Sequence, residues 1–363
     1  MADPARSPRQ APKGRGTGSN PANRFESTRS NPFDDGWPGA AEEAPPPRTT
    51  LAPEAARSAL NYNDSPDLGF DRSLNPYRGC EHGCIYCFAR PSHAWLGLSP
   101  GLDFETRLSF KPDMPDILAR ELSRPGYVPR AVVLGANTDA YQPIERETGL
   151  TRRVLEVLER FRHPVSIVTK GAGVLRDADI LARMAKLDLV RVCVSLTTLD
   201  PGLSRAMEPR AASPRRRLQA MRELAAQGIP VAVLAAPMIP ALNDHEMEAI
   251  LEGAAGAGAR SAGWVLLRLP HELRELFTEW LERHRPERAA RVLALIRQTR
   301  GGKLYDADFA QRQSGTGPYA ALLARRFELA CTRLGLARRS AEWGRLNTAA
   351  FDPGALDPQP RLL

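Results

Sequence analysis

The segment Asn75-Pro-Tyr-Arg-Gly-Cys-Glu-His-Gly-Cys-Ile-Tyr-Cys87 contains three of the five cysteines of the chain, Cys80, Cys84 and Cys87. A structural zinc site or an electron-transfer cluster normally has four protein ligands, whereas a metal site that performs chemistry keeps one coordination position open. Three cysteines separated by three and then two residues therefore predict a [4Fe–4S] cluster in which one iron has no protein ligand.

Two other metal sites are compatible with this segment. Zinc could take His82 or His93 as a fourth ligand, although His82 lies between the first two cysteines and the usual paired Cys-x2-Cys arrangement is absent. A ferredoxin-like cluster would require a further cysteine and a proline after the last one, where this chain has Phe88. The alternatives are thus a zinc-stabilised binding protein, or a non-enzymatic iron–sulfur protein that senses redox state or oxygen.

The overall composition is that of an ordinary globular protein. The 363 residues are 42% hydrophobic and 25% charged, and no apolar run approaches the length of about 18 residues that a membrane span needs. The N-terminus has no apolar secretory core. Cys193 and Cys331 lie far apart in the sequence, which does not indicate a disulfide framework. These features predict a cytoplasmic protein without a membrane partner.

The formal net charge is +8. The first 60 residues are almost balanced in charge, so the excess belongs to the rest of the chain. A basic body is compatible with a polyanionic partner such as nucleic acid, although solvated arginine-rich faces are a commoner cause.

Four regions differ in their sequence pattern. Residues 1–58 are rich in Pro, Ala and Arg and are expected to be a disordered tail. Residues 59–270 alternate short apolar runs with longer amphipathic ones, which indicates repeated β-α units and a parallel sheet. Residues 271–345 are expected to form a helical cap, and residues 346–363 a loose C-terminal tail.

Six strands are predicted in the second region. The first leads into Cys80, and the others span residues 131–136, 165–170, 190–196, 231–237 and 264–268. Helices are expected over residues 151–161 and 176–187, and a third has Ser213 as N-cap, Pro214 in its first turn and Gly228 after its end. Six units are too few for an eight-stranded barrel, so the predicted fold is α/β, a partial (β/α)6 TIM-type barrel with its site at the C-terminal strand ends.

The cysteine segment carries a family resemblance. Cys80-x3-Cys84-x2-Cys87 with Tyr86 before the last cysteine resembles the motif of the radical S-adenosylmethionine (SAM) superfamily, and Asn75 to Arg90 resembles its spore photoproduct lyase-like branch, often labelled "DNA repair photolyase". The resemblance covers about residues 55–340. It implies that three thiolates hold a [4Fe–4S] cluster and that SAM binds the fourth iron.

The resemblance also implies a reaction and partners. An electron from the cluster would cleave SAM to a 5′-deoxyadenosyl radical, which removes a hydrogen atom from a substrate. A low-potential donor such as flavodoxin or ferredoxin would supply the electron. Whether SAM is consumed or regenerated, and whether the substrate is nucleic acid, stays open.

Further cofactor residues follow from the resemblance one by one. Tyr86 and Phe88 match aromatic positions that contact the adenosyl group, and Asn137-Thr138-Asp139 matches the segment near the methionine end. Lys170 and Ser195 resemble residues that reach the polar groups of SAM. Without the resemblance, these would be read as core aromatics, an Asx-type turn and ordinary strand-end polarity.

The chain departs from spore photoproduct lyase at one position. That enzyme has a hydrogen-donor cysteine just ahead of its Thr/Ser-Asp segment, where this chain has Ala136-Asn137. Cys193 offers a substitute, because alternation along a strand places it on the same face as Ser195. A buried cysteine that packs as an apolar residue is the alternative for Cys193.

Overall fold

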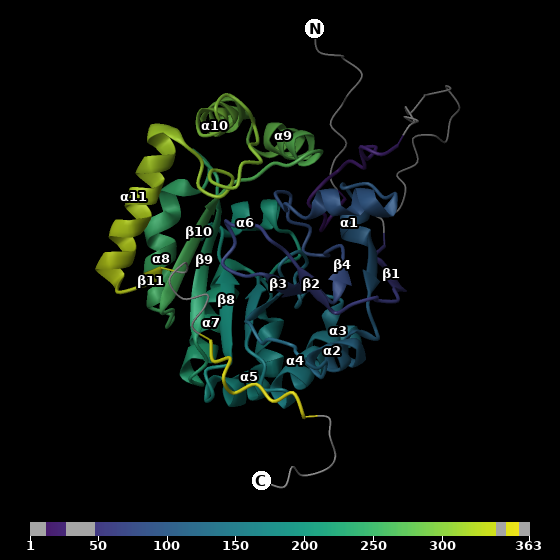
Figure 1. Ribbon diagram of the computed structural model, residues 1–363. Helices are drawn as coiled ribbons and strands as arrows, with labels where there is room; N and C mark the ends of the chain where they lie inside the picture. The colour runs from purple at the N-terminus through teal and green to yellow at the C-terminus, as the bar shows by residue number, and fades with distance from the viewer. Residues whose placement is uncertain (1–11, 27–47, 339–345, 356–363) are drawn as a thin grey trace.

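The computed structural model describes residues 12–26, 48–338 and 346–355. Its centre is an eight-stranded sheet with the order β11-β10-β9-β8-β7-β6-β3-β2, in which every pairing is parallel except that of β2 with β3. Figure 1 shows this curved sheet with helices along its outer face. The predicted α/β partial barrel is therefore confirmed.

The six predicted strands correspond to six strands of this sheet. They are β3 (Arg72–Leu74), β6 (Val132–Leu134), β7 (Val165–Thr169), β8 (Val190–Ser195), β9 (Val231–Met238) and β10 (Ser261–Leu266). Nearly all of their side chains are buried, because helices cover one face and the interior of the barrel the other. The last strand begins three residues earlier than expected, since the small residues at its start give no β signal.

Edge strands extend the sheet at both ends. They are β2 (Leu60–Tyr62) and β11 (Ala337–Arg338). A second sheet within the described residues has the order β1-β5-β4 and consists of β1 (Thr50–Pro53), β4 (Tyr77–Arg78) and β5 (Arg107–Phe110).

The helices of the barrel follow the predicted pattern. They are α1 (Asp103–Thr106), α2 (Met114–Leu122), α3 (Glu145–Thr148), α4 (Leu150–Arg160), α5 (Ala178–Ala185), α6 (Pro201–Met207), α7 (Pro214–Ala226) and α8 (Met247–Ala255), with 3₁₀ turns η1 (Arg90–Leu96), η2 (Ala172–Asp177) and η3 (Asp244–Glu246). The Ser213 hydroxyl accepts a hydrogen bond from the Arg216 amide and caps α7 as predicted. The helix expected over residues 176–187 is divided between η2 and α5.

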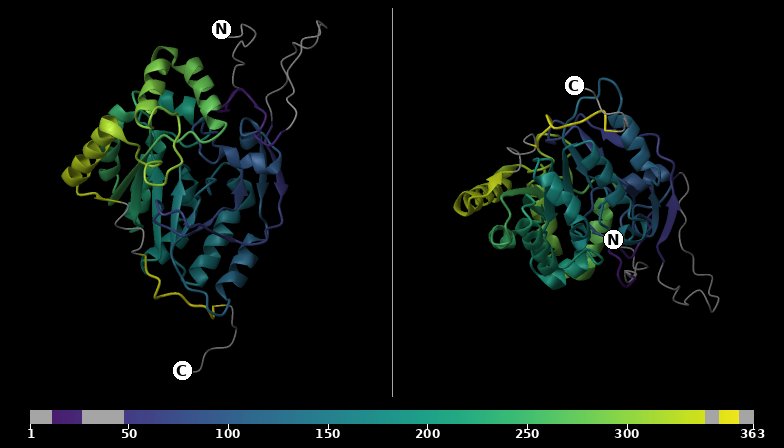
Figure 2. Two further views of the ribbon diagram at one scale, coloured as in Figure 1. Left: turned by 45° about the horizontal axis from the view of Figure 1, so that its top comes forward. Right: turned by 90° about the horizontal axis from the view of Figure 1, so that it is seen from below.

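The helices of the C-terminal region are α9 (Leu273–His284), α10 (Pro286–Gln298) and α11 (Gly317–Leu334). Helices α9 and α10 lie over one end of the sheet, whereas α11 lies along α8 on the side of the barrel (Figures 1 and 2). Strand β11 then pairs in parallel with β10. This part of the predicted cap thus continues the β-α pattern of the barrel.

The prediction of a disordered tail is wrong for two described stretches. Thr50–Pro53 pairs along its whole length with β5. Residues 12–26 pack beside α1 and α9 at the end of the barrel that α9 covers (Figure 2), and Arg15 is 8% exposed. The composition of these stretches predicts disorder because it counts only their own apolar residues. It does not include the few contacts with the folded body that hold them. The predictions for residues 1–11 and 27–47 lie outside the described residues.

The predicted loose C-terminal tail is wrong for residues 346–355. The Asn347 amide donates to the Asp188 carbonyl at 2.9 Å, and the Phe351 ring lies 5.5 Å from Tyr127 and 5.6 Å from His163. The segment therefore packs on the opposite end of the barrel from α9 (Figure 1). Residues 356–363 lie outside the described part of the chain.

Candidate functional site

A cavity of about 490 Å³ opens at the C-terminal ends of the barrel strands. Its wall includes all three clustered cysteines and most of the site residues that the sequence predicts. The predicted residues that line it are Cys80, Cys84, Tyr86, Cys87, Phe88, Asn137, Asp139, Lys170 and Ser195.

The three cysteine thiols face this cavity from the loop that follows β4. Cys80 and Cys84 are 6% and 7% exposed, and Cys87 is partly exposed. Burial raises the pKa of Cys80 well above its usual range, and the charges of Asp139, Cys84 and Cys87 raise it further. The thiols are thus close enough to oppose one another's ionisation, so a bound cation that attracts thiolates would stabilise the loop.

Arg90 fixes the shape of the cysteine loop. Its side chain is fully buried and donates to the carbonyls of Cys84 at 2.8 Å, Gly83 at 3.0 Å, Gly101 at 3.0 Å and Pro100 at 3.2 Å. It also pairs with the fully buried carboxylate of Glu105. One guanidinium therefore ties the loop to the chain that precedes α1.

Gln142 holds the other end of the loop. Its side-chain oxygen accepts from the Glu81 amide at 2.8 Å, and its amide group donates to the Gly79 carbonyl at 3.2 Å. Both contacts flank Cys80, so the orientation of this thiol is set from the segment that follows β6.

The N-terminal segment closes over the cysteine loop. The Gly16 amide donates to Glu105 at 2.9 Å, and Arg15 donates to the Glu105 carbonyl at 2.9 Å. A Cβ atom on Gly16 would lie 1.8 Å from the Gly83 carbonyl oxygen, so only glycine allows this approach.

Asp139 is the acidic residue of the cavity wall within the described chain. It accepts hydrogen bonds from the Lys170 amide at 2.6 Å, the Thr169 hydroxyl at 2.7 Å and the Tyr141 amide at 2.9 Å. His82 Nδ1 lies 3.3 Å from its Oδ2. Burial alone would raise the pKa of Asp139, but the His82 charge and these hydrogen bonds outweigh it and lower the pKa. The carboxylate thus stays ionised and links the cysteine loop to β7.

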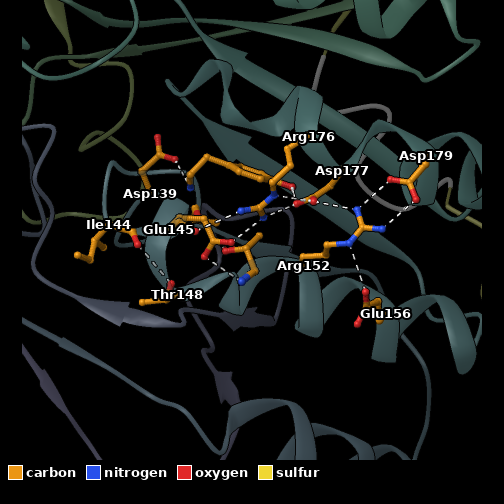
Figure 3. A network of polar contacts seen from close by, with 12 residues as sticks. Asp139, Ile144, Glu145, Thr148, Arg152, Glu156, Arg176, Asp177 and Asp179 are labelled. Carbon is orange, nitrogen blue, oxygen red and sulfur yellow. Dashed lines mark hydrogen bonds and ion pairs between the residues drawn. The ribbon is translucent and has the colours of Figure 1, made fainter.

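A polar network braces the chain that follows Asp139 (Figure 3). Arg176 pairs with Glu145 at 2.6 Å and with Asp177 at 2.8 Å, and Arg152 joins Asp177 to Asp179. The network connects the segment after β6 with η2, α4 and α5. It therefore stabilises the framework behind Asp139 and does not itself line the cavity.

Lys170 and Tyr86 meet on the cavity wall. The Lys170 ammonium lies 5.7 Å from the centre of the Tyr86 ring, and the Tyr86 hydroxyl lies 3.0 Å from the Thr197 hydroxyl. Thr197 in turn donates to Glu208 at 2.7 Å, and Glu208 forms a fully buried ion pair with Arg217. Glu208 thus supports Tyr86 from behind and is not a cavity residue.

Three of the predicted residues have contacts that restrict their roles. Ser195 lines the cavity but donates to the Ala236 carbonyl at 3.3 Å. Thr138 is buried and donates to the Tyr77 carbonyl at 2.9 Å, so it contributes to the turn and not to the cavity wall. Cys193 is 1% exposed, packs with Ala232 and with the wall residue Leu234, and does not itself line the cavity.

Several wall residues were missed by the sequence prediction. The edge strand β2 and its following loop contribute Asn61, Tyr62, Asn63 and Phe70, and a loop before α11 contributes Arg312 and Gln313. Asp67 joins these two loops by accepting hydrogen bonds from Nε and Nη2 of Arg312, each at 2.6 Å. No spacing in the sequence links segments 245 residues apart, so only the fold brings them together.

Comparison with known sequences identifies the family of this site. The model of the radical SAM superfamily matches residues 74–254. An uncharacterised protein of Mycobacterium bovis is 37% identical over 245 residues, which cover 67% of this chain and 72% of that protein. An uncharacterised protein of Methanocaldococcus jannaschii is 28% identical over 191 residues, which cover 53% of this chain and 68% of that protein.

The fold is similar to that of solved radical SAM proteins. A variant of spore photoproduct lyase superposes with a TM-score of 0.56 at 16% identity, over 79% of this chain and 81% of that one. A variant of the same enzyme with bound SAM and a dinucleoside spore photoproduct gives 0.53 at 15% identity, with the same coverage. At this identity the likeness concerns the fold. Together with the sequence matches, it establishes that the chain belongs to the radical SAM superfamily.

Proposed function

We propose that the chain cleaves SAM reductively at a [4Fe–4S] cluster held by Cys80, Cys84 and Cys87, and that it abstracts hydrogen from a substrate at the cavity mouth. The chain is a radical SAM enzyme, and its superfamily uses this cluster and SAM as cofactors. One observation carries the residue assignment: the three thiols share a single cavity wall with Tyr86, Asp139, Lys170 and Ser195.

The donor set fits a cluster better than a single ion. The described residues contain no group of three or more His, Cys, Asp or Glu side chains placed to hold one metal ion. His93, one of the two zinc ligands considered from the sequence, contacts the Arg107 carbonyl at 3.1 Å and does not line the cavity. In a cluster each thiolate binds a different iron, which suits thiols that come from one loop without meeting at a point.

Bound together, the cluster and SAM would supply an electron and a 5′-deoxyadenosyl radical for hydrogen abstraction. The chain itself would orient and shield these groups. Tyr86 and Phe88 would offer flat apolar surfaces to the adenosyl group, and Lys170 would bind the SAM carboxylate. Asn137 accompanies them on the wall, and Asp139 holds the cysteine loop against β7. The apolar lining limits water at the reacting centre.

The substrate and partners are part of the same proposal. A nucleic acid is a candidate substrate because the chain carries a net charge of +8 and a protein of similar fold binds a dinucleoside photoproduct. Five free cysteines fit a reducing compartment such as the cytoplasm, where flavodoxin or ferredoxin could donate the electron. None of the helices in the described ranges has the length and apolar character of a membrane span.

Anaerobic reconstitution tests the assignment of the cysteines. The parent protein should bind about four irons per chain, change its electron paramagnetic resonance spectrum when SAM is added, and form 5′-deoxyadenosine with dithionite. Cys84→Ala should lose all three properties. Cys331→Ala is the matched control, because Cys331 is buried in α11 away from the cavity. A Cys84→Ala protein that behaves like the parent, or a parent that yields no 5′-deoxyadenosine, would refute the proposal.

A further inference from the structure

Arg268 is an unpaired cation on the cavity wall. It follows β10, and its guanidinium lies 5.2 Å from the centre of the Phe88 ring. Its Nε atom is buried and has no hydrogen-bond partner, and the side chain forms no ion pair with any described residue. Arg312, on the same wall, is neutralised by two hydrogen bonds to Asp67. Of the two arginines on this wall, Arg312 is therefore paired with a carboxylate of the described residues and Arg268 is not.

A second guanidinium lies behind Arg268. Arg300 is 1% exposed and donates to the Gln311 carbonyl at 2.7 Å and the Leu267 carbonyl at 3.0 Å, but to no carboxylate of the part of the chain that the structure describes. Burial lowers the pKa of Arg300 to about 10, the charge of Arg268 contributes to this shift, and Asp306 offsets it only in part. Two neighbouring cations without a bonded anion are unfavourable, and an anion that binds Arg268 would relieve this.

The charges of the wall leave Arg268 available for a ligand other than SAM. Asp139, the acid of the described wall, is already engaged by Thr169 and the Lys170 amide. SAM brings one carboxylate, which Lys170 would bind, since Lys170 follows β7 and lies beside Tyr86 of the cysteine loop. Arg268 lies against Phe88, a residue expected beside the adenosyl group and not beside the SAM carboxylate, and Phe88 is 44% exposed, so Arg268 borders the open side of the cavity.

We propose that Arg268 binds an oxyanion of the substrate, a carboxylate or a phosphate, at the cavity mouth. The inference rests on the proposed function only in taking this cavity as the active site. A guanidinium presents its N–H groups as a rigid fork that matches either oxyanion. Stacking on Phe88 fixes the plane of this fork and leaves its edge free. The enzyme would thus act on an anionic substrate held by a directional contact.

Chemical footprinting of the anaerobically reconstituted full chain tests this proposal. Phenylglyoxal modifies accessible arginines, and trypsin then reports residue 268 at the junction of peptides Ser261–Arg268 and Leu269–Arg274. Arg274, on α9, is the internal control in the next peptide and does not line the cavity. The probes are inorganic phosphate and acetate, each compared with chloride at equal ionic strength.

We expect millimolar phosphate or acetate to slow modification of Arg268 by about threefold or more and to leave Arg274 unchanged. Protection by phosphate alone would identify a phosphate-bearing substrate, and equal protection by both would identify any oxyanion, including a carboxylate. Equal rates with and without either anion would overturn the proposal. The proposal would also be overturned if saturating SAM abolished the protection of Arg268 by the anions, because Arg268 would then bind the cofactor.

Thermal unfolding provides a second readout. Phosphate should raise the melting temperature of the parent and of Arg274→Gln but not of Arg268→Gln, since only a ligand of the native state shifts this equilibrium. An equal rise in Arg268→Gln would count against the site. Neither measurement needs SAM cleavage, so a failure of the radical chemistry would leave the anion result intact, and the reverse also holds.

Discussion

Replacing Arg90 with methionine tests the role of the buried clamp on the cysteine loop. The substitution keeps an unbranched side chain but removes the charge and every hydrogen bond that Arg90 donates. Four backbone carbonyls would lose a donor, and the fully buried Glu105 carboxylate would keep, among the described residues, the Gly16 amide as its hydrogen-bond donor. The loop that carries Cys84 would then lack its main tie to residues 100–105.

The expected cost is set by the unpaired carboxylate. Removing one partner of a buried ion pair destabilises a protein by about 3–5 kcal/mol. At roughly 2 °C per kcal/mol for a long chain, the melting temperature should fall by about 6–10 °C. In Arg90→Met/Glu105→Gln neither charge of this pair remains, so we expect a coupling energy of about 1–3 kcal/mol in favour of the double variant.

Urea unfolding of the metal-free protein measures these free energies, and iron content after reconstitution measures the effect on the loop. Arg153→Met, on the exposed side of α4, is the surface control and should change stability by less than about 0.5 kcal/mol. If Arg90→Met unfolds like Arg153→Met and keeps its iron, the clamp has no role. If the double variant is no better than the sum of the single ones, the unpaired charge is not the cause.

Three further changes follow from other contacts. Gly83→Ala should lose about 1–2 kcal/mol of unfolding free energy and bind less iron, because φ is +66° and its Cβ would lie 2.7 Å from Glu105 Oε2. Gly97→Ala, at φ +68° in open space, is the control and should lose stability but no iron. Equal iron loss in both variants would contradict this. Burial lowers the pKa of His163 to about 4, so the native state binds fewer protons than the unfolded one between that value and 6.5. Stability should therefore fall by about 2 kcal/mol from pH 7 to pH 5, and a urea midpoint that falls equally in His163→Gln would exclude this cause. Phe351→Ala should destabilise by about 1–2 kcal/mol in urea unfolding, because its half-buried ring packs on Phe161 and Tyr127, and an unchanged midpoint would restore the prediction of a loose tail.

The barrel strands could be predicted because their signal is local. Val165–Thr169 and Val190–Ser195 are buried on both faces, and their β-branched residues between turn segments indicate strands. Strands β1 and β2 have mostly exposed side chains and only three or four residues each. Their pairing depends on partners elsewhere in the chain, and no periodicity within them shows it.

The end of the cavity near the cysteines could be predicted for a related reason. In a parallel barrel each strand delivers the residue at its C-terminal end to the same rim, so Asp139, Lys170 and Ser195 converge once the strands are known. The mouth does not follow this rule. Tyr62 comes from an antiparallel edge strand and Gln313 from a loop beyond α10, and neither position is fixed by the β-α repeat.

This division between the two ends of the cavity has a consequence for substrate choice. The residues near the cysteines are delivered by the barrel itself, so their convergence follows from the fold. The mouth combines Arg268 with segments that lie outside the repeat, and Asp67 joins two of them by neutralising Arg312. No carboxylate among the described residues pairs with Arg268 in this way. We therefore expect Arg268 and these added loops to determine which substrate binds. Ala136 stands where spore photoproduct lyase has its hydrogen-donor cysteine, which argues against that repair reaction but not against any particular substrate.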